Sequence, residues 1–187
     1  GGVMTGSKKV ITLNLNRIVQ DWYRHHGPSG DDIEYTLQEY ITKIVKRVHK
    51  YLNAWDAKLR DDLANNMLPA YTAGFIALEK QFLTVGVNGF VEAAEFLATK
   101  NNTPYNGIKV DPNNEAYRIL SLDILGIIET HNRLARTSNV KYNLEFVPGE
   151  NASAKLYEWD KRDGYVVPQG RNLYNSYFYV VEDDSLT

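Results

Sequence analysis

Two kinds of hydrophobic periodicity alternate along this 187-residue chain, and their order constrains the fold more than any other feature. A two-residue repeat rich in β-branched and aromatic residues is typical of strands, whereas apolar residues three or four positions apart are typical of helices. The expected strands are 9–17, 81–87, 141–147 and 174–181. The expected helices are 32–66, 90–97, 117 to about 136, and 150–162. Strands separated by helices indicate parallel βαβ units and therefore an α/β fold.

The longest expected helix has one apolar stripe, which predicts that it covers a sheet. The stripe consists of Leu37, Ile41, Ile44, Val48, Leu52, Trp55, Leu59 and Leu63. Residues 101–113 are rich in Asn, Pro and Gly and are expected to form a loop. The cluster 111–114 is expected to supply the next helix with a cap and a first-turn proline.

Length and charge limit the possible architectures and partners. With 43% apolar residues the chain can build one core, but a complete α/β barrel usually needs about 250 residues. We therefore expect a single domain, 1–187, that forms part of a barrel. The net charge of -2 argues against nucleic-acid binding. The sequence also has no membrane-length apolar stretch and no recognisable leader, so we expect a cytoplasmic protein.

The chain contains no cysteine, which excludes disulfides, thiolate metal ligands and thiol nucleophiles within it. Its four histidines are too scattered to indicate a metal site; they are His25, His26, His49 and His131. Motifs of serine hydrolases, phosphate-loop enzymes and dinucleotide-binding proteins are also absent. The sequence thus predicts neither catalytic nor metal-binding residues within this chain.

A candidate binding site lies where the strand 141–147 gives way to the helix 150–162. A helix N-terminus exposes unpaired N–H groups and a partial positive charge, so it can hold a phosphate. Gly149 permits close approach of the backbone, while Asn151 and Ser153 offer side-chain donors. The alternative is that Asn151 or Ser153 only caps the helix.

Two further segments could contribute to such a site. The turn Gly86–Gly89 follows another expected strand, and ligands of parallel α/β folds gather at the carboxyl ends of strands. Asn175 and Ser176 lie between aromatic residues and could orient a sugar or phosphate. Both segments could instead be ordinary turns.

Four segments carry a family resemblance, in the same order along most of the chain. They are Gly6–Ile18, Phe82–Gly89 with Glu92–Ala94, Val147–Asn151, and Tyr174–Phe178. Together they resemble the later part of the catalytic barrel of anaerobic, class III ribonucleoside-triphosphate reductases. The first segment resembles the strand that follows the cysteine-bearing finger loop, and the third resembles a Pro-Ala-Glu-Asn-type turn. Gly149 departs from that turn, where alanine is expected in many members.

The resemblance implies a partial ten-stranded α/β barrel of the glycyl radical enzyme and ribonucleotide reductase type. In such enzymes a glycyl radical, generated by a radical S-adenosylmethionine activase, oxidises a cysteine. The resulting thiyl radical then starts conversion of a ribonucleoside triphosphate to the deoxyribonucleotide. Formate or a thiol system supplies the reducing equivalents, and a structural zinc and a homodimer are usual. This chain has neither the finger-loop cysteine nor a recognisable glycyl-radical segment, so alone it is expected to be inactive.

The resemblance also assigns substrate-positioning roles in the barrel mouth. The expected substrate-binding residues are Gly149, Glu150, Asn151, Ala152 and Ser153 for the triphosphate, Asn175 and Ser176 beside the ribose, and Gly86, Asn88 and Asn14 at the mouth. Besides the triphosphate, the expected partners are the remainder of the reductase chain and the activase. Two alternatives stay open: another glycyl radical enzyme acting on a small carbon substrate, and a non-catalytic split subunit that binds nucleotide or completes a partner's barrel.

Overall fold

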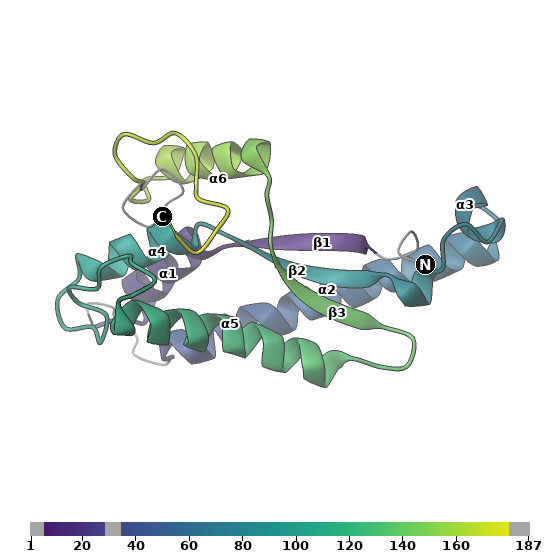
Figure 1. Ribbon diagram of the computed structural model, residues 1–187, viewed down its shortest axis with the longest axis horizontal. Helices are drawn as coiled ribbons and strands as arrows, with labels where there is room; N and C mark the ends of the chain where they lie inside the picture. Colours follow the sequence, from purple (N-terminus) through teal and green to yellow (C-terminus); the bar gives the residue numbers. More distant parts are fainter. Residues whose placement is uncertain (1–5, 29–34, 180–187) are drawn as a thin grey trace.

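A parallel three-stranded sheet with helices packed around it forms the centre of the molecule (Figure 1). The computed structural model describes residues 6–28 and 35–179. In chain order the elements are β1 (Ser7–Asn14), α1 (Leu15–His25), α2 (Leu37–Ala64), α3 (Pro69–Thr72), the 3-10 turn η2 (Leu78–Lys80), β2 (Phe82–Asn88), α4 (Phe90–Ala98), α5 (Glu115–Ala135), β3 (Lys141–Phe146) and α6 (Glu150–Arg162).

The strands lie in the order β1-β2-β3, and every neighbouring pair is parallel. The central strand β2 is buried along almost its whole length, as is typical of a strand covered on both faces. The register pairs Asn14 with Asn88 and Val87 with Phe146. The carboxyl ends of all three strands therefore meet at one edge of the sheet.

Helices α2 and α5 pack against each other and run along the sheet, while α1 packs against α4 (Figure 1). Helix α6 lies apart from α2 and α5, near the carboxyl ends of the strands. One continuous apolar core joins the strands to α1, α2, α4 and α5. The predicted parallel βαβ architecture is thus confirmed.

The long helix α2 buries four of the eight residues of the stripe predicted for it, and three more are half-buried. Leu37, Ile41 and Leu52 are fully buried, and Thr36 caps the helix in a reciprocal capping box with Glu39. Trp55 was expected in the buried stripe but is exposed, and Lys9 Nζ lies 3.8 Å from the centre of its ring. The expected start at residue 32 lies outside the described residues.

Helix α1 was missed in the sequence, where 15–17 were predicted to continue the first strand. The strand ends at Asn14 because the Asn14 side chain caps the next helix, its Oδ1 accepting a hydrogen bond from the Arg17 N–H. Leu15, Val19 and Trp22 then bury one helical face. The apolar alternation continues to Leu15, so the change from a strand repeat to a helical repeat after Asn14 could not be recognised from the pattern.

The predicted final strand, 174–181, is wrong over the part that the structure describes. Residues 174–179 have no regular secondary structure, and 180–181 lie outside the described residues. The Asn175 N–H donates to the Glu92 side chain and its carbonyl accepts from Gly89. These tertiary contacts override the strand preference of the aromatic residues.

The connection before α5 is a loop, as predicted, and Asn114 caps α5 through a hydrogen bond from the Tyr117 N–H. Pro112 precedes this cap, so the predicted first-turn proline is wrong. β2, α4, β3 and α6 lie close to their predicted bounds.

The described residues form three strands, so they do not themselves make a ten-stranded barrel. Strands β1 and β3 each have one neighbouring strand within this sheet. No helix in the described ranges is both long and apolar enough to cross a bilayer.

A buried ion pair fastens β1 to α2. Lys8 Nζ lies 2.5 Å from Asp56 Oδ1, and the exposed fractions of the two side chains are 0% and 6%. Arg60 Nε donates to the second carboxylate oxygen at 2.8 Å. Burial alone would raise the pKa of Asp56, but the hydrogen bonds from Lys8 and Arg60 outweigh it and lower the pKa.

Replacing Asp56 with alanine should destabilise the protein by about 3–5 kcal/mol, because the buried Lys8 charge loses its carboxylate and keeps only the Leu78 carbonyl as a partner. The free energy of unfolding, measured in urea at pH 7, checks this. Since the folded-state pKa of Asp56 is lowered, its contribution is present above the unfolded pKa of about 3.9 and is lost as the pH falls through the folded value. The loss of unfolding free energy caused by Asp56→Ala should therefore become smaller in acid.

Asp61→Ala is the control, because the Asp61 side chain is 68% exposed and lies 3.9 Å from Lys58. It should change the stability by less than about 1 kcal/mol. Equal losses in the two variants would contradict the assignment of Asp56 as a buried anchor.

Candidate functional site

The candidate site lies at the edge of the sheet where the parallel strands end. Beyond β3 the chain turns at Pro148 and enters α6 with Gly149 as its N-cap. Among the described residues no side chain caps this helix, so the alternative that Asn151 or Ser153 is its cap is wrong. A Cβ at Gly149 would meet the Ala152 Cβ at 3.4 Å, an ordinary contact that alanine could make.

A cavity of about 470 Å³ adjoins the start of α6. It is lined by Pro148, Gly149, Glu150, Asn151, Ser176 and Tyr177. The first N–H groups of a helix have no partner within the helix, and the helix dipole is positive at that end. The cavity therefore combines an anion-binding helix end with a hydroxyl group from the C-terminal segment.

Behind the cavity, Asn88 joins the two sides of the site. Its Nδ2 lies 2.8 Å from Ser153 Oγ and 3.4 Å from Ser176 Oγ, and the two hydroxyl oxygens are 3.2 Å apart. Asn88 is 2% exposed, yet its Oδ1 has no hydrogen-bond partner among the described residues. A buried carbonyl oxygen without a partner carries a desolvation cost that a ligand or water could remove.

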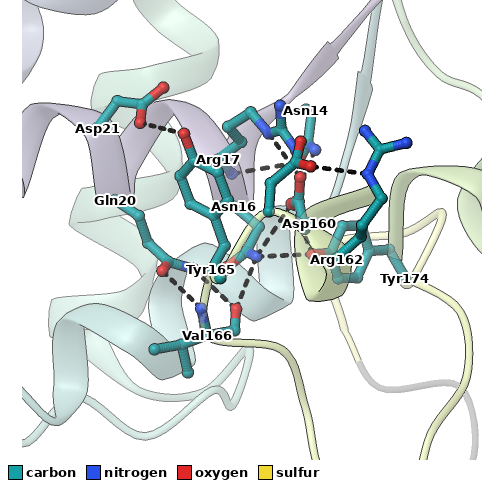
Figure 2. A network of polar contacts seen from close by, with 12 residues as sticks. Asn14, Asn16, Arg17, Gln20, Asp21, Asp160, Arg162, Tyr165, Val166 and Tyr174 are labelled. Atoms are coloured by element: carbon teal, nitrogen blue, oxygen red, sulfur yellow. Dashed lines mark hydrogen bonds and ion pairs between the residues drawn. The ribbon is translucent and has the colours of Figure 1, made fainter. Parts of the chain in front are cut away.

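Asp160 fixes α6 against β1 and α1 (Figure 2). Its fully buried carboxylate accepts hydrogen bonds from Asn14 Nδ2 at 2.9 Å, Arg17 Nε at 2.6 Å and the Tyr174 hydroxyl at 2.7 Å. Burial, followed by the hydrogen bond to Asp160, raises the pKa of Tyr174 far above its usual range. Tyr174 therefore remains a hydrogen-bond donor at every physiological pH.

The same network holds the segment after α6. Asn16 Nδ2 donates to the Tyr174 hydroxyl at 2.7 Å and to the Val166 carbonyl at 3.0 Å. Gln20 binds both backbone groups of Val166, its Nε2 donating to the carbonyl and its Oε1 accepting from the N–H, each at 2.8 Å (Figure 2). Helix α1 therefore binds both α6 and the segment after it, which leads to Ser176.

A second buried carboxylate, Glu92, lies in the first turn of α4. Its Oε1 accepts from the Asn175 N–H at 3.0 Å and from Asn175 Nδ2 at 2.8 Å. Burial raises the pKa of Glu92, although the hydrogen bonds from Asn175 act in the opposite direction. Glu92 thus binds the residue directly before Ser176.

The structure brings together most of the residues predicted from the sequence. The residues at or beside the cavity are Asn88, Gly149, Glu150, Asn151, Ala152, Ser153 and Ser176. Both ends of the Asn14 side-chain amide already have partners, since Nδ2 donates to Asp160 and Oδ1 accepts from the Arg17 N–H. The Asn175 amide nitrogen is likewise held by Glu92.

Gly86 has a packing reason for lacking a side chain. A Cβ at this position would lie 2.6 Å from Val147 Cγ2 and 2.8 Å from Thr12 Oγ1, so the space beside it is already filled. Gly89 also needs to be glycine, because its φ of 70° is in the left-handed region.

Asp160, Arg17 and Glu92 were not predicted as site residues. A signal for Asp160 exists, since Ser153, Tyr157 and Asp160 follow one another at helical spacing and share the buried face of α6. Glu92 interrupts an otherwise apolar helix start, which is a weaker indication. Within residues 6–28 and 35–179 no group of three or more His, Asp or Glu side chains could hold a metal ion.

The whole chain, residues 1–187, matches the family model described as anaerobic ribonucleoside-triphosphate reductase. The chain belongs to this family. No curated protein matches its sequence significantly. Among solved structures, the anaerobic ribonucleotide reductase of Thermotoga maritima with citrate in the active site is 22% identical, with a TM-score of 0.75, and the match covers 95% of this chain and 31% of the other.

The Thermotoga maritima reductase in complex with dATP and CTP is also similar, at 23% identity and a TM-score of 0.72, with coverage of 95% of this chain and 28% of that one. This chain thus spans about a third of the length of the solved reductases. At this level of identity the likeness shows a shared mixed α/β fold.

Replacing Asp160 with alanine should destabilise the protein by about 3–5 kcal/mol, because Arg17, Asn14 and the Tyr174 hydroxyl lose one common acceptor. Urea unfolding monitored by circular dichroism measures this loss. Asp163→Ala is the control, since Asp163 also binds Arg17 but its side chain is 32% exposed, and it should cost less than about 1 kcal/mol. A loss at Asp160 no larger than that at Asp163 would show that the buried network does not anchor α6.

Proposed function

We propose that this chain is part of an anaerobic ribonucleoside-triphosphate reductase and that it binds the triphosphate of the substrate at the start of α6. The observation that carries this proposal is the uncapped N-terminus of α6 at the wall of a cavity of about 470 Å³. The unpartnered, buried Oδ1 of Asn88 behind the cavity supports it independently. A related reductase forms a complex with dATP and CTP.

The phosphate contacts would come from backbone rather than from basic side chains. The N–H groups of Glu150, Asn151 and Ala152 are in the first turn of α6, where the helix dipole favours an anion. The Ser153 N–H already donates to the Gly149 carbonyl at 2.8 Å, so Ser153 would contribute through its side chain. The Ser176 hydroxyl faces the same cavity and would add a donor. Asn175 and Ser176 would lie beside the ribose.

Glu150 has a different role from its neighbours, because a carboxylate repels a phosphate. It lines the cavity and is exposed. Magnesium binds carboxylate and phosphate oxygens together in many nucleotide sites. Glu150 would therefore act on the triphosphate through its magnesium ion.

The radical chemistry of the proposed enzyme lies outside this chain. The chain has no cysteine, so the thiyl radical and the cysteine ligands of zinc would come from the remainder of the reductase. The glycyl radical would also lie there, since no segment of this sequence resembles the glycyl-radical region, and the chain alone would be inactive. Strands β1 and β3 offer their outer edges for pairing with that remainder, which would complete a ten-stranded barrel. The activase, a formate or thiol reductant, a homodimer and a cytoplasmic location belong to the same proposal.

The family match favours a reductase over a glycyl radical enzyme that acts on a small carbon substrate. A small substrate would also have no need of a helix N-terminus placed for phosphates. This chain would orient the substrate, because a radical reaction requires the substrate carbon to face the radical and not the protein.

Exchanging Asn151 and Ser153 together for alanine, in a full-length reductase carrying this segment, should weaken binding of ribonucleoside triphosphates about tenfold. The change removes one side chain at the cavity and frees Asn88, which loses its bond to Ser153. Equilibrium binding of the triphosphate measures the effect, and activase affinity is measured in parallel.

Glu158→Gln on α6 is the matched control, because Glu158 is exposed and lies two turns beyond the start of the helix. It should leave both affinities unchanged. Unchanged triphosphate affinity in the Asn151 and Ser153 double variant would refute the assigned site.

A further inference from the structure

Glu92 is a buried carboxylate that the proposed substrate contacts do not use. It is 3% exposed, although the helix around it is apolar and includes Phe90, Val91 and Ala93. Burying a carboxylate is costly unless its hydrogen bonds compensate. Oε1 of Glu92 accepts two hydrogen bonds, both from Asn175, and lies 3.8 Å from the Arg171 guanidinium. Oε2 has no hydrogen-bond partner among the described residues.

Asn175 is held on both sides of its backbone by the start of α4. Its N–H donates to Glu92 at 3.0 Å, and its carbonyl oxygen accepts from the Gly89 N–H at 3.3 Å. The Asn175 side chain adds the 2.8 Å bond to Glu92. These three bonds fix Asn175 relative to the end of β2.

The residue that follows, Ser176, faces the cavity at the start of α6. Its segment, 174–179, has no regular secondary structure, so no strand ladder determines where its hydroxyl lies. Ser176 Oγ makes a 3.2 Å contact with Ser153 and a longer one of 3.4 Å with Asn88. Its position therefore depends strongly on the anchoring of Asn175.

We propose that Glu92 is a positioning residue that fixes Asn175 and thereby holds the Ser176 hydroxyl at the triphosphate cavity. This inference rests on the proposed function of that cavity. Glu92 itself would not touch the substrate. Both bonds to Asn175 end at Oε1, so holding Asn175 requires an acceptor at that atom. The negative charge serves the longer contact with Arg171.

The test is a double-mutant cycle in a full-length reductase that carries this segment, with KM and kcat measured for a ribonucleoside triphosphate. Ser176→Ala should raise KM about tenfold, the usual effect of losing a hydrogen bond to a charged group. Glu92→Ala should raise KM by a similar factor, and the effect should fall mainly on KM. Combining the two should add little, since both remove the same contact.

Glu92→Gln should restore KM to near the wild-type value, because glutamine keeps an acceptor oxygen at the position of Oε1. Glu129→Gln on α5 is the control, since Glu129 is 54% exposed and pairs with Arg136 at 3.7 Å, away from Glu92. It should leave KM unchanged. If Glu92→Ala does not fold, Glu92→Asp replaces it, because the shorter side chain draws the acceptor away from Asn175 and should raise KM likewise.

The outcomes separate this inference from the proposal on which it rests. If Ser176→Ala raises KM but the Glu92 variants do not, or if the two effects add fully, the positioning role is overturned and the triphosphate site stands. If the Ser176 variant and the Asn151 and Ser153 double variant all leave KM unchanged, the triphosphate site itself is overturned.

Discussion

The buried carboxylate of Asp160 is the interaction on which the arrangement of the site depends. An ionised group without exposure must receive hydrogen bonds from the protein, and Asp160 obtains them from β1, α1 and the C-terminal segment. Those elements are far apart in the sequence, and α6 lies apart from the helices that cover the sheet. The direction of α6 is therefore determined by buried polar contacts at both of its ends, those of Asp160 and the bond between Ser153 and Asn88.

The parallel sheet supplies the second constraint. Because the strands share one direction, the ends of β1 and β2 and the turn after β3 meet at a single edge. Asn88 can then reach Ser153 and Ser176 at once. Two buried carboxylates, Asp160 and Glu92, hold the irregular segment at consecutive residues, Tyr174 and Asn175. A site made of backbone N–H groups and hydroxyls gains its geometry from these supports.

Local sequence patterns predicted the elements whose ends coincide with a change in periodicity. β2, β3 and α6 are of this kind, and the strand-to-helix turn at Gly149 pointed directly to the cavity. Helix α1 was missed because a single capping residue, Asn14, ends a strand whose apolar alternation continues. The prediction of a final strand was wrong because Asn175 and Ser176 bind the side chains of distant residues and do not pair with a neighbouring strand. Glu92 carries only a weak local signal, and its partner could not be predicted locally, since Asn175 lies 83 positions away.

The central claim is that the triphosphate of a ribonucleoside triphosphate binds at the start of α6. The most direct measurement is a crystal structure of a full-length reductase carrying this segment, with the substrate bound. The account predicts phosphate oxygens about 2.7–3.2 Å from the backbone nitrogens of 150–152, with the Ser176 hydroxyl beside them. A triphosphate bound elsewhere, with only water at the start of α6, would contradict it.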